Sequence, residues 1–392
     1  MKSGNAILSS YGTTIFEVMS RLSEEHGAIN LGQGFPDDRG PADVLEVASQ
    51  ALLDGWNQYP SMMGTPELRQ ALAAHGKRFY NLDIDWKSEV MVTSGATEAL
   101  TASLLGLINP GDEVVLFQPM YDSYLPIIRL AGGVPRFVSL KAPDWSFSRA
   151  DLEAAFSPKT KLVLINDPLN PAAKVFSRAE LELLAEFVQR FDAFAVCDEV
   201  YEHIVFDGRP HIPLMTLPGM RDRCLKIGSA GKTFSLTGWK VGYITGAAHL
   251  LQPVAKAHQY VTFTTAPNLQ TAVAYGLGKE DAYFAGLASG LQAKRDRLAE
   301  GLRSVGFDVL PSAGTYFVVA DISPFDGSPF GFDDDDEAFC RRLTAEAGVT
   351  AIPVGAFFAE DAPKSFIRFC FSKKDEILDG AVDRLRRHFG RR

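Results

Sequence analysis

Short apolar runs alternate with amphipathic stretches from about residue 88 to residue 247. The apolar runs have the length of buried β-strands, and two of the intervening stretches, Thr97–Ile108 and Arg178–Gln189, have helical periodicity. The predicted strands are Val90–Thr93, Glu113–Gln118, Pro135–Leu140, Lys161–Asn166, Phe194–Val200, Cys224–Ser229 and Val241–Ala247. This alternation predicts an α/β domain with a mainly parallel seven-stranded sheet covered by helices.

The pattern changes after about residue 286. A charged helix is expected over Leu291–Val305, and the last helix over Lys374–Phe389. Strands are expected near Tyr316–Ala320 and Phe366–Phe371, which indicates a smaller α+β domain. The first 45 residues are too few to fold alone and are expected to join it. The predicted division is therefore 1–45 for a segment of the small domain, 46–285 for the large domain and 286–392 for the small C-terminal domain.

Composition narrows the class of protein. The 392 residues are 46% hydrophobic and 22% charged, which is typical of a globular protein. The net charge of −9 offers no basic surface for a nucleic acid. No apolar run approaches the roughly 18 residues that would cross a membrane, and the N-terminus lacks a signal-peptide pattern. We therefore expect a cytoplasmic protein without nucleic-acid or membrane partners.

The cysteine and acidic residues do not predict a metal site. The four cysteines have no metal-type spacing, and Cys197, Cys224 and Cys370 lie in apolar runs where reduced core packing is favoured. An acidic run, 333–337, precedes a helical pattern over Ala338–Ala347. Carboxylates at a helix N-terminus are a structural device, and this interpretation is preferred to a metal site.

The most informative segment is Ser229-Ala-Gly-Lys-Thr-Phe-Ser-Leu-Thr-Gly-Trp-Lys-Val-Gly242. It places Lys232 among small and hydroxyl residues, with Lys240 eight positions later. A nucleotide-binding P-loop is excluded because Lys226 occupies the position of the required glycine. A lysine in a surface turn remains an alternative. A lysine that forms a Schiff base beside an anion site is what pyridoxal phosphate (PLP) requires, because this cofactor carries both an aldehyde and a phosphate.

Three further motifs follow predicted strands, where ligands bind in an open parallel sheet. Thr93-Ser-Gly-Ala-Thr-Glu-Ala99 opens a helix and could bind an anion. Asn166-Asp-Pro-Leu-Asn-Pro171 holds an asparagine between prolines. Phe194-Ala-Val-Cys-Asp-Glu-Val-Tyr201 ends a strand in an acid that needs a cation if it is buried. Each motif alone could be an ordinary turn, but together they favour a cofactor site.

These motifs, with Leu31-Gly-Gln-Gly-Phe-Pro-Asp37, resemble the fold-type I PLP-dependent aminotransferases of class I/II over nearly the whole chain. The similarity is greatest to the branch of kynurenine–glutamine transaminases and bacterial methionine aminotransferases. It implies a large PLP-binding domain, a smaller α+β domain and a homodimer with shared active sites. It also implies ping-pong transfer of an amino group between an α-amino acid and a 2-oxo acid.

The resemblance implies a role for each matching residue. Lys232 would form the Schiff base, Asp198 would pair with the pyridine nitrogen, and Tyr201 would act with Asn170 on the ring oxygen. The other expected cofactor contacts are Gly95, Ala96, Thr97, Ser229 and Lys240 on the phosphate, Tyr121 on the ring, and Tyr59 on the phosphate of the neighbouring subunit. Arg368 would bind the substrate α-carboxylate, for which a guanidinium is suited. Gly34, Asn170, Ile15 and Phe263 complete the expected substrate site.

The donor and the reaction type leave alternatives open. The expected pocket residues Ile15, Tyr121, Phe263, Tyr316 and Phe358 are apolar or aromatic, which favours methionine, an aromatic amino acid or glutamine as donor. Ile15 replaces a pocket tryptophan of the mammalian kynurenine enzymes, Thr264 replaces a histidine of some members, and Ala173 replaces a usual glycine after Asn170. A β-lyase acting on cysteine conjugates, or a non-catalytic ligand-binding protein, are the alternatives.

Overall fold

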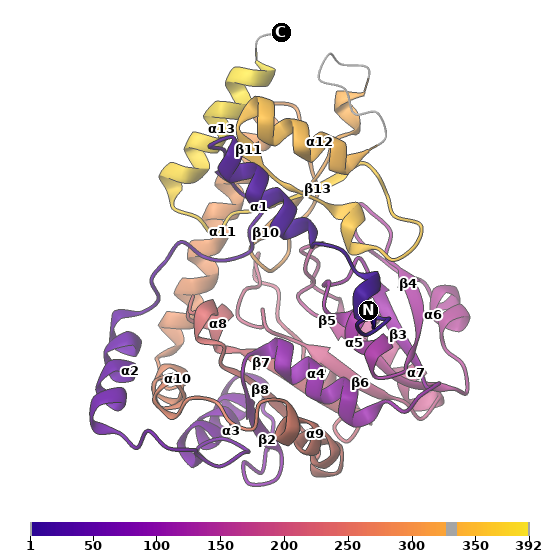
Figure 1. Cartoon of the computed structure of the whole chain (residues 1–392), viewed down its shortest axis with the longest axis vertical. Helices are drawn as coiled ribbons and strands as arrows, with labels where there is room; N and C mark the ends of the chain where they lie inside the picture. The colour runs from indigo at the N-terminus through magenta and orange to yellow at the C-terminus, as the bar shows by residue number, and fades with distance from the viewer. Residues whose placement is uncertain (1, 327–334, 391–392) are drawn as a thin grey trace.

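The computed structural model describes residues 2–326 and 335–390. Its elements form a broad part that contains a large sheet and a narrower part that contains α1 (Ile15–Glu25), α12 (Asp336–Arg342) and α13 (Asp375–Phe389) (Figure 1). The 24-residue helix α11 (Asp281–Ser304) runs from the broad part into the narrow part. A single continuous helix, α11, therefore connects the two parts of the molecule.

The large sheet contains seven strands. They are β2 (Val90–Thr93), β3 (Glu113–Gln118), β4 (Val134–Ser139), β5 (Thr160–Asn166), β6 (Phe194–Asp198), β7 (Cys224–Ser229) and β8 (Gly242–Gly246). Their spatial order is β2-β8-β7-β6-β5-β3-β4. Only β8 runs against its neighbours, β2 and β7, and the other pairs in this sheet are parallel. The predicted fold class, a mainly parallel seven-stranded sheet with helices, is confirmed.

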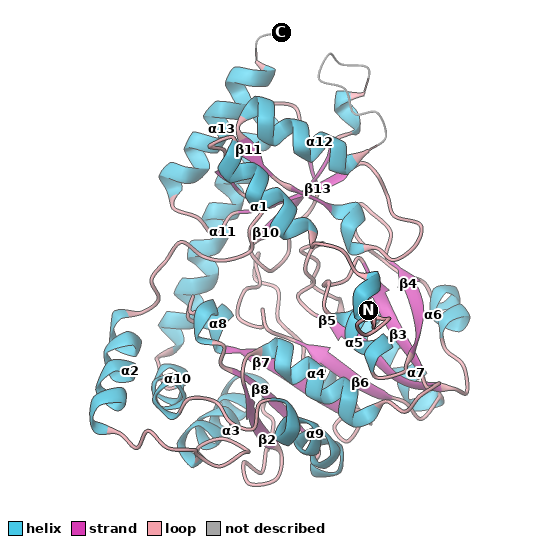
Figure 2. Ribbon diagram, in the orientation of Figure 1, coloured by secondary structure: helices cyan, strands magenta, loops and turns pink. Residues whose placement is uncertain are grey.

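Alternate residues of each central strand enter different cores. Leu162 and Leu164 of β5 belong to one buried cluster, whereas Val163 and Ile165 belong to the other. A strand that is buried on both faces must be apolar throughout, which explains the continuous apolar runs in the sequence. Helices α4 (Ala96–Leu107) and α9 (Ala248–Val261) pack together on one face, and α7 (Arg178–Arg190) packs in the opposite core (Figure 2).

The remaining helices of the broad part flank the sheet. They are α2 (Ala42–Asp54), α3 (Pro66–Tyr80), α5 (Tyr124–Leu130), α6 (Arg149–Ala155), the short α8 (Ala230–Thr233) and α10 (Pro267–Leu277). Local sequence explains several starts: Thr65 caps α3 with Pro66 in its first turn, and Ser177 forms a capping box with Glu180 in α7.

The narrow part holds two small sheets. An antiparallel sheet has the order β12-β13-β10-β9, formed by β9 (Asp308–Val309), β10 (Phe317–Asp321), β12 (Ile352–Pro353) and β13 (Phe366–Cys370). The N-terminal β1 (Ile29–Asn30) pairs in parallel with β11 (Val349–Thr350). A hydrogen-bonded ladder thus joins a segment near the N-terminus to the C-terminal third of the chain. The domain boundaries at 45 and 285 stay a prediction.

Two local predictions differ from the structure. Helix α11 begins at Asp281, ten residues before the expected start at Leu291, because its first turns are mostly exposed and contain Gly286 and Gly290, which weaken the helical signal. The expected helix over Ala338–Ala347 is α12 followed by a π-helical turn, Leu343–Ala347. Asp335 caps α12, and residues 333–334 of the acidic run lie outside the described residues.

The four cysteines are free and buried, which agrees with the predicted core packing. Among the described residues, no helix is both long and apolar enough to cross a membrane.

Candidate active site

The motifs that follow the strands meet at one edge of the large sheet. Strands β2, β5, β6 and β7 all end at this edge, and the antiparallel β8 begins there. A cavity of about 290 Å³ opens beyond the strand ends. Its lining includes Phe16, Gly34, Gly95, Ala96, Thr97, Tyr121, Asp122, Tyr124, Asn170, Asp198, Tyr201, Ser229, Lys232, Lys240, Phe317 and Arg368. Most of the predicted site residues therefore share a single cavity, as expected for an open parallel sheet.

Lys232 lies on the short helix α8, directly after β7. Its Nζ atom donates to the hydroxyl of Tyr316 at 2.7 Å, and that hydroxyl donates to the carbonyl of Gly34 at 2.6 Å. Burial lowers the pKa of Lys232 to about 8, against the attraction of Asp198 and with help from the charge of Lys240. About a tenth of this amine is therefore neutral at pH 7, which supplies the form that a nucleophile requires.

Asp198 is the last residue of β6 and is buried. Its Oδ2 atom accepts a hydrogen bond from the hydroxyl of Tyr124 at 2.6 Å. Burial raises the pKa of Asp198 from its ordinary value of 3.8 to about 6, although the bond from Tyr124 opposes this rise. The protein compensates the buried charge of Asp198 only in part, so a cationic ligand group beside this carboxylate would be stabilised.

Asn170 and Arg368 are joined across the two parts of the molecule. The Nη1 atom of Arg368 donates to Oδ1 of Asn170 at 2.7 Å, and Nη2 donates to the carbonyl of Gly32 at 2.9 Å. Because Arg368 engages the amide oxygen, the NH₂ group of Asn170 remains as a donor for a ligand. The guanidinium lies 3.9 Å from the ring centroid of Phe317, and its Nε atom is buried without a partner. Burial lowers the pKa of Arg368 to about 10, so it stays charged at neutral pH.

The predicted anion site is formed by the start of α4 and by Lys240. Gly95 has φ 82°, and a Cβ atom added there would lie 3.0 Å from Cε of Lys240. The amides of Ala96 and Thr97 open α4 beside this contact, and Ser229 lines the same cavity. Backbone amides at a helix start, a lysine and a hydroxyl form a donor set that suits a phosphate.

Tyr121, Tyr201 and Gly34 also lie where the sequence placed them in the site. Tyr121 and Tyr201 line the cavity, and burial raises the pKa of both phenols, so they are protonated donors. A Cβ atom at Gly34 would lie 2.8 Å from the ring of Phe317, which shows how closely the backbone approaches the cavity wall.

Five expected residues lie outside the cavity lining: Ile15, Tyr59, Phe263, Tyr316 and Phe358. Phe16 lines the cavity instead of its neighbour Ile15, which packs against the core. Tyr59 is 80% exposed and makes an edge contact with Phe263 at 5.6 Å. Phe263 is also exposed, so this aromatic pair lies on the surface of the subunit.

Sequence reasoning missed several residues of the cavity. Asp122 and Tyr124 lie within three residues of the predicted Tyr121, and Phe317 directly follows the predicted Tyr316. The ring of Tyr124 lies 5.7 Å from that of Tyr121, but helical spacing does not indicate this contact, because α5 begins only at Tyr124. Phe358, which was expected in the pocket, packs instead against the buried cluster that contains Val163 and Ile165.

Known proteins resemble the whole of this chain. The family described as aminotransferase class I and II matches residues 26–385. A probable N-succinyldiaminopimelate aminotransferase of Mycobacterium tuberculosis is 44% identical over 390 residues, covering 96% of each chain. The kynurenine–oxoglutarate transaminase 3 of Mus musculus is 38% identical over 395 residues, covering 95% of this chain and 87% of the relative. The crystal structure of YbdL from Escherichia coli, identified as a methionine aminotransferase, has a TM-score of 0.94 and 39% identity, covering 99% of this chain and 100% of that chain.

Proposed function

The chain belongs to the class I and II aminotransferases, and from this premise we propose that its cavity binds PLP and accepts donors with an apolar, aromatic or amide side chain. Aminotransferases act on an amino acid and a 2-oxo acid, and the named relatives are all transaminases, so the β-lyase alternative is not favoured. The observation that carries the proposal is the convergence of Lys232, Asp198 and Arg368 on one cavity.

The residues around the cavity fit PLP in shape and in charge. The amides of Ala96 and Thr97, with Ser229 and Lys240, would hold its phosphate, and the glycine at position 95 lets Lys240 lie close to the start of α4. Asp198 would pair with its pyridinium, which removes the cost of the buried carboxylate. Asn170 and Tyr201 would donate to its ring oxygen, and Tyr121 would cover its face. Bound there, PLP supplies an aldehyde for the Schiff base and a ring that absorbs electrons from the substrate Cα.

Three residues around the cavity would have separate roles in the reaction. Arg368 orients the substrate carboxylate, which contributes through proximity. The neutral amine of Lys232 would take the proton from the substrate Cα and deliver it to the cofactor carbon C4′, acting first as a base and then as an acid. Tyr316, which accepts from Lys232 and donates to the carbonyl of Gly34, would hold the amine in position.

The donor preference follows from the charges in the cavity. Its cations, Lys232, Lys240 and Arg368, each have a task in binding the cofactor or the α-carboxylate. Asp122, also in the lining, would repel a second carboxylate on the substrate. Phe16 and Phe317 provide an apolar wall. We therefore expect methionine, aromatic amino acids and glutamine to be better donors than aspartate.

The exposed pair of Tyr59 and Phe263 supports a homodimer with shared sites. Leu53, Trp56 and Tyr260 are also highly exposed in the single chain, at 75%, 78% and 83%. Large exposed apolar side chains of this kind mark an interaction surface. Tyr59 would then reach the phosphate of the partner subunit's cofactor. The division at 45 and 285 remains part of this proposal.

Lys232→Ala provides the test. The variant should lose the visible-edge absorbance of the bound cofactor and lose transamination by orders of magnitude, whereas the exposed Lys256→Ala should change neither. Full activity in Lys232→Ala would refute the assignment.

The holoenzyme mixed with an amino acid and no oxo acid separates transamination from elimination. One turnover to the amino form of the cofactor supports transamination, and sustained release of ammonia would contradict it. A panel of amino donors then tests the side-chain preference.

A further inference from the structure

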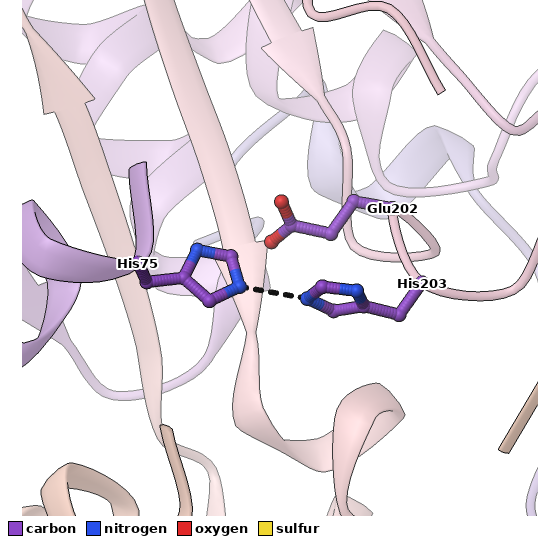
Figure 3. Close-up of side chains that lie close together, drawn as sticks. All are labelled: His75, Glu202 and His203. Atoms are coloured by element: carbon purple, nitrogen blue, oxygen red, sulfur yellow. Dashed lines mark hydrogen bonds between the residues drawn. The ribbon is translucent and has the colours of Figure 1, made fainter. Parts of the chain in front are cut away.

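Three potential metal ligands lie together between the end of α3 and the segment that follows β6. His75 is in the last turns of α3, and Glu202 and His203 follow β6 shortly after Asp198. One ligand atom from each lies within 4.8 Å of the others. The two Nε2 atoms are 2.7 Å apart, and the carboxylate of Glu202 points towards the gap between the rings (Figure 3). The cluster is thus converging, with its donor atoms facing one another.

The donor atoms of the cluster are of the types that first-row transition-metal ions prefer. Two imidazole nitrogens and one carboxylate oxygen suit Zn²⁺ and related first-row ions, whereas Mg²⁺ and Ca²⁺ prefer all-oxygen sites.

Glu202 keeps one carboxylate oxygen available to a cation. Lys226 and the hydroxyl of Tyr80 bind its Oε2 atom at 2.7 and 2.6 Å. Among the described residues, the Oε1 atom has a contact of 3.5 Å from Tyr243 and can turn to an ion. The nearby Glu199 lies 3.8 Å from Lys226 but is paired with the buried His211 at 2.8 Å. The carboxylate of Glu202 is therefore the ligand charge that the cluster offers to a divalent ion.

The surroundings fix the rings and leave a route to solvent. Phe79 and Phe284 pack against His203 with centroid distances of 4.8 and 4.5 Å. His75 and Glu202 are buried, whereas His203 is partly exposed, so an ion can reach the cluster from that side. A tetrahedral Zn²⁺ with bonds of about 2.0–2.1 Å needs nitrogens about 3.3 Å apart. The two nitrogens, 2.7 Å apart, would have to separate by about 0.6 Å.

We propose that His75, Glu202 and His203 form a structural binding site for one divalent ion of the zinc type per subunit, separate from the cofactor cavity. The bound ion would connect α3 to the segment that carries Asp198 and Tyr201. The sequence could not indicate this site, because His75 and His203 are 128 positions apart. In the absence of an ion, the same two imidazoles form a hydrogen bond.

The holoenzyme, stripped with a chelator, should be titrated with ZnCl₂ by calorimetry. The wild type should bind one Zn²⁺ per subunit with a raised unfolding temperature, and MgCl₂ should not compete. His75→Gln and His203→Gln should each weaken binding at least about tenfold. The exposed His249→Gln is the matched control and should bind as the wild type does. Lys232→Ala should retain the site, which separates this proposal from the proposed function.

Equal binding by the wild type and both cluster variants, or no stoichiometric site in the wild type, would show a hydrogen-bonded imidazole pair only. Zinc X-ray absorption of the wild type decides the matter even if a variant fails to fold. Imidazole scattering with a first shell at about 2.0–2.1 Å is expected. A shell without imidazole would overturn the proposal.

Discussion

Replacing Asp198 by asparagine should stabilise the cofactor-free protein at neutral pH while it removes the activity. The pKa of Asp198 rises from 3.8 to about 6 in the folded chain, because burial penalises its charge. The folded state therefore binds a proton more tightly than the unfolded state, and stability falls as pH rises from about 4 to about 6. At 1.36 kcal/mol for each unit of pKa, the full penalty is about 3 kcal/mol above pH 7 and about half of that at pH 5.

Asparagine is nearly isosteric and can still accept the hydrogen bond from Tyr124, so the variant avoids the charge without leaving a cavity. Urea unfolding of the cofactor-free wild type and Asp198→Asn at pH 5 and pH 7.5 measures the difference. The variant should be more stable at both values, with the gain about 1.5 kcal/mol larger at pH 7.5. Loss of stability at pH 7.5, or a gain that does not depend on pH, would refute the reasoning.

Four further substitutions test other contacts. Tyr124→Phe removes a bond to ionised Asp198 and should raise the pKa of Asp198 by about one unit, which the pH dependence of cofactor-free stability would show. Ala173→Gly should raise the unfolding temperature by about 1–2 °C, because Ala173 has φ 57°, whereas Ala172→Gly, without positive φ, should lower it. Arg368→Lys loses the planar fork and should raise KM for the amino donor about tenfold or more, with a smaller effect on kcat. Lys226→Met leaves Glu202 without its cation and should cost about 3–5 kcal/mol in urea unfolding, and adding Glu202→Gln should restore much of this loss.

The order of the elements in the large sheet could be predicted because its strands are buried on both faces. Such strands are mostly continuous apolar runs that end at polar residues, so β2, β3 and β7 were predicted with their observed bounds and the others within a few residues. Two residues of the proposed active site lie at the ends of these runs, since Asp198 is the last residue of β6 and Lys232 follows β7. The reversal of β8 was not predicted, since the apolar pattern of a strand is independent of its direction.

What could not be predicted depends on side-chain direction and on long-range contacts. Ile15 and Phe16 are both apolar and adjacent at the start of α1, and only the rotation of the helix determines which one reaches the cavity. The bond between Arg368 and Asn170 joins residues 198 positions apart, and no local pattern indicates it. The cytoplasmic location and the dimer stay predictions.

The bond between Arg368 and Asn170 would link thermodynamically the two recognition events proposed for these residues. The guanidinium that is to bind the substrate carboxylate also holds the amide that is to contact the cofactor ring. A carboxylate that draws Arg368 towards itself would weaken the hydrogen bond from Arg368 to Asn170. The contact between the Asn170 amide and the cofactor ring would then change as well. By reciprocity, the state of the cofactor ring must alter the affinity for the carboxylate by the same factor. A carboxylate that has no amino group should therefore shift the pKa of the bound cofactor. Binding of the substrate carboxylate would then change the cofactor before the substrate amine reacts.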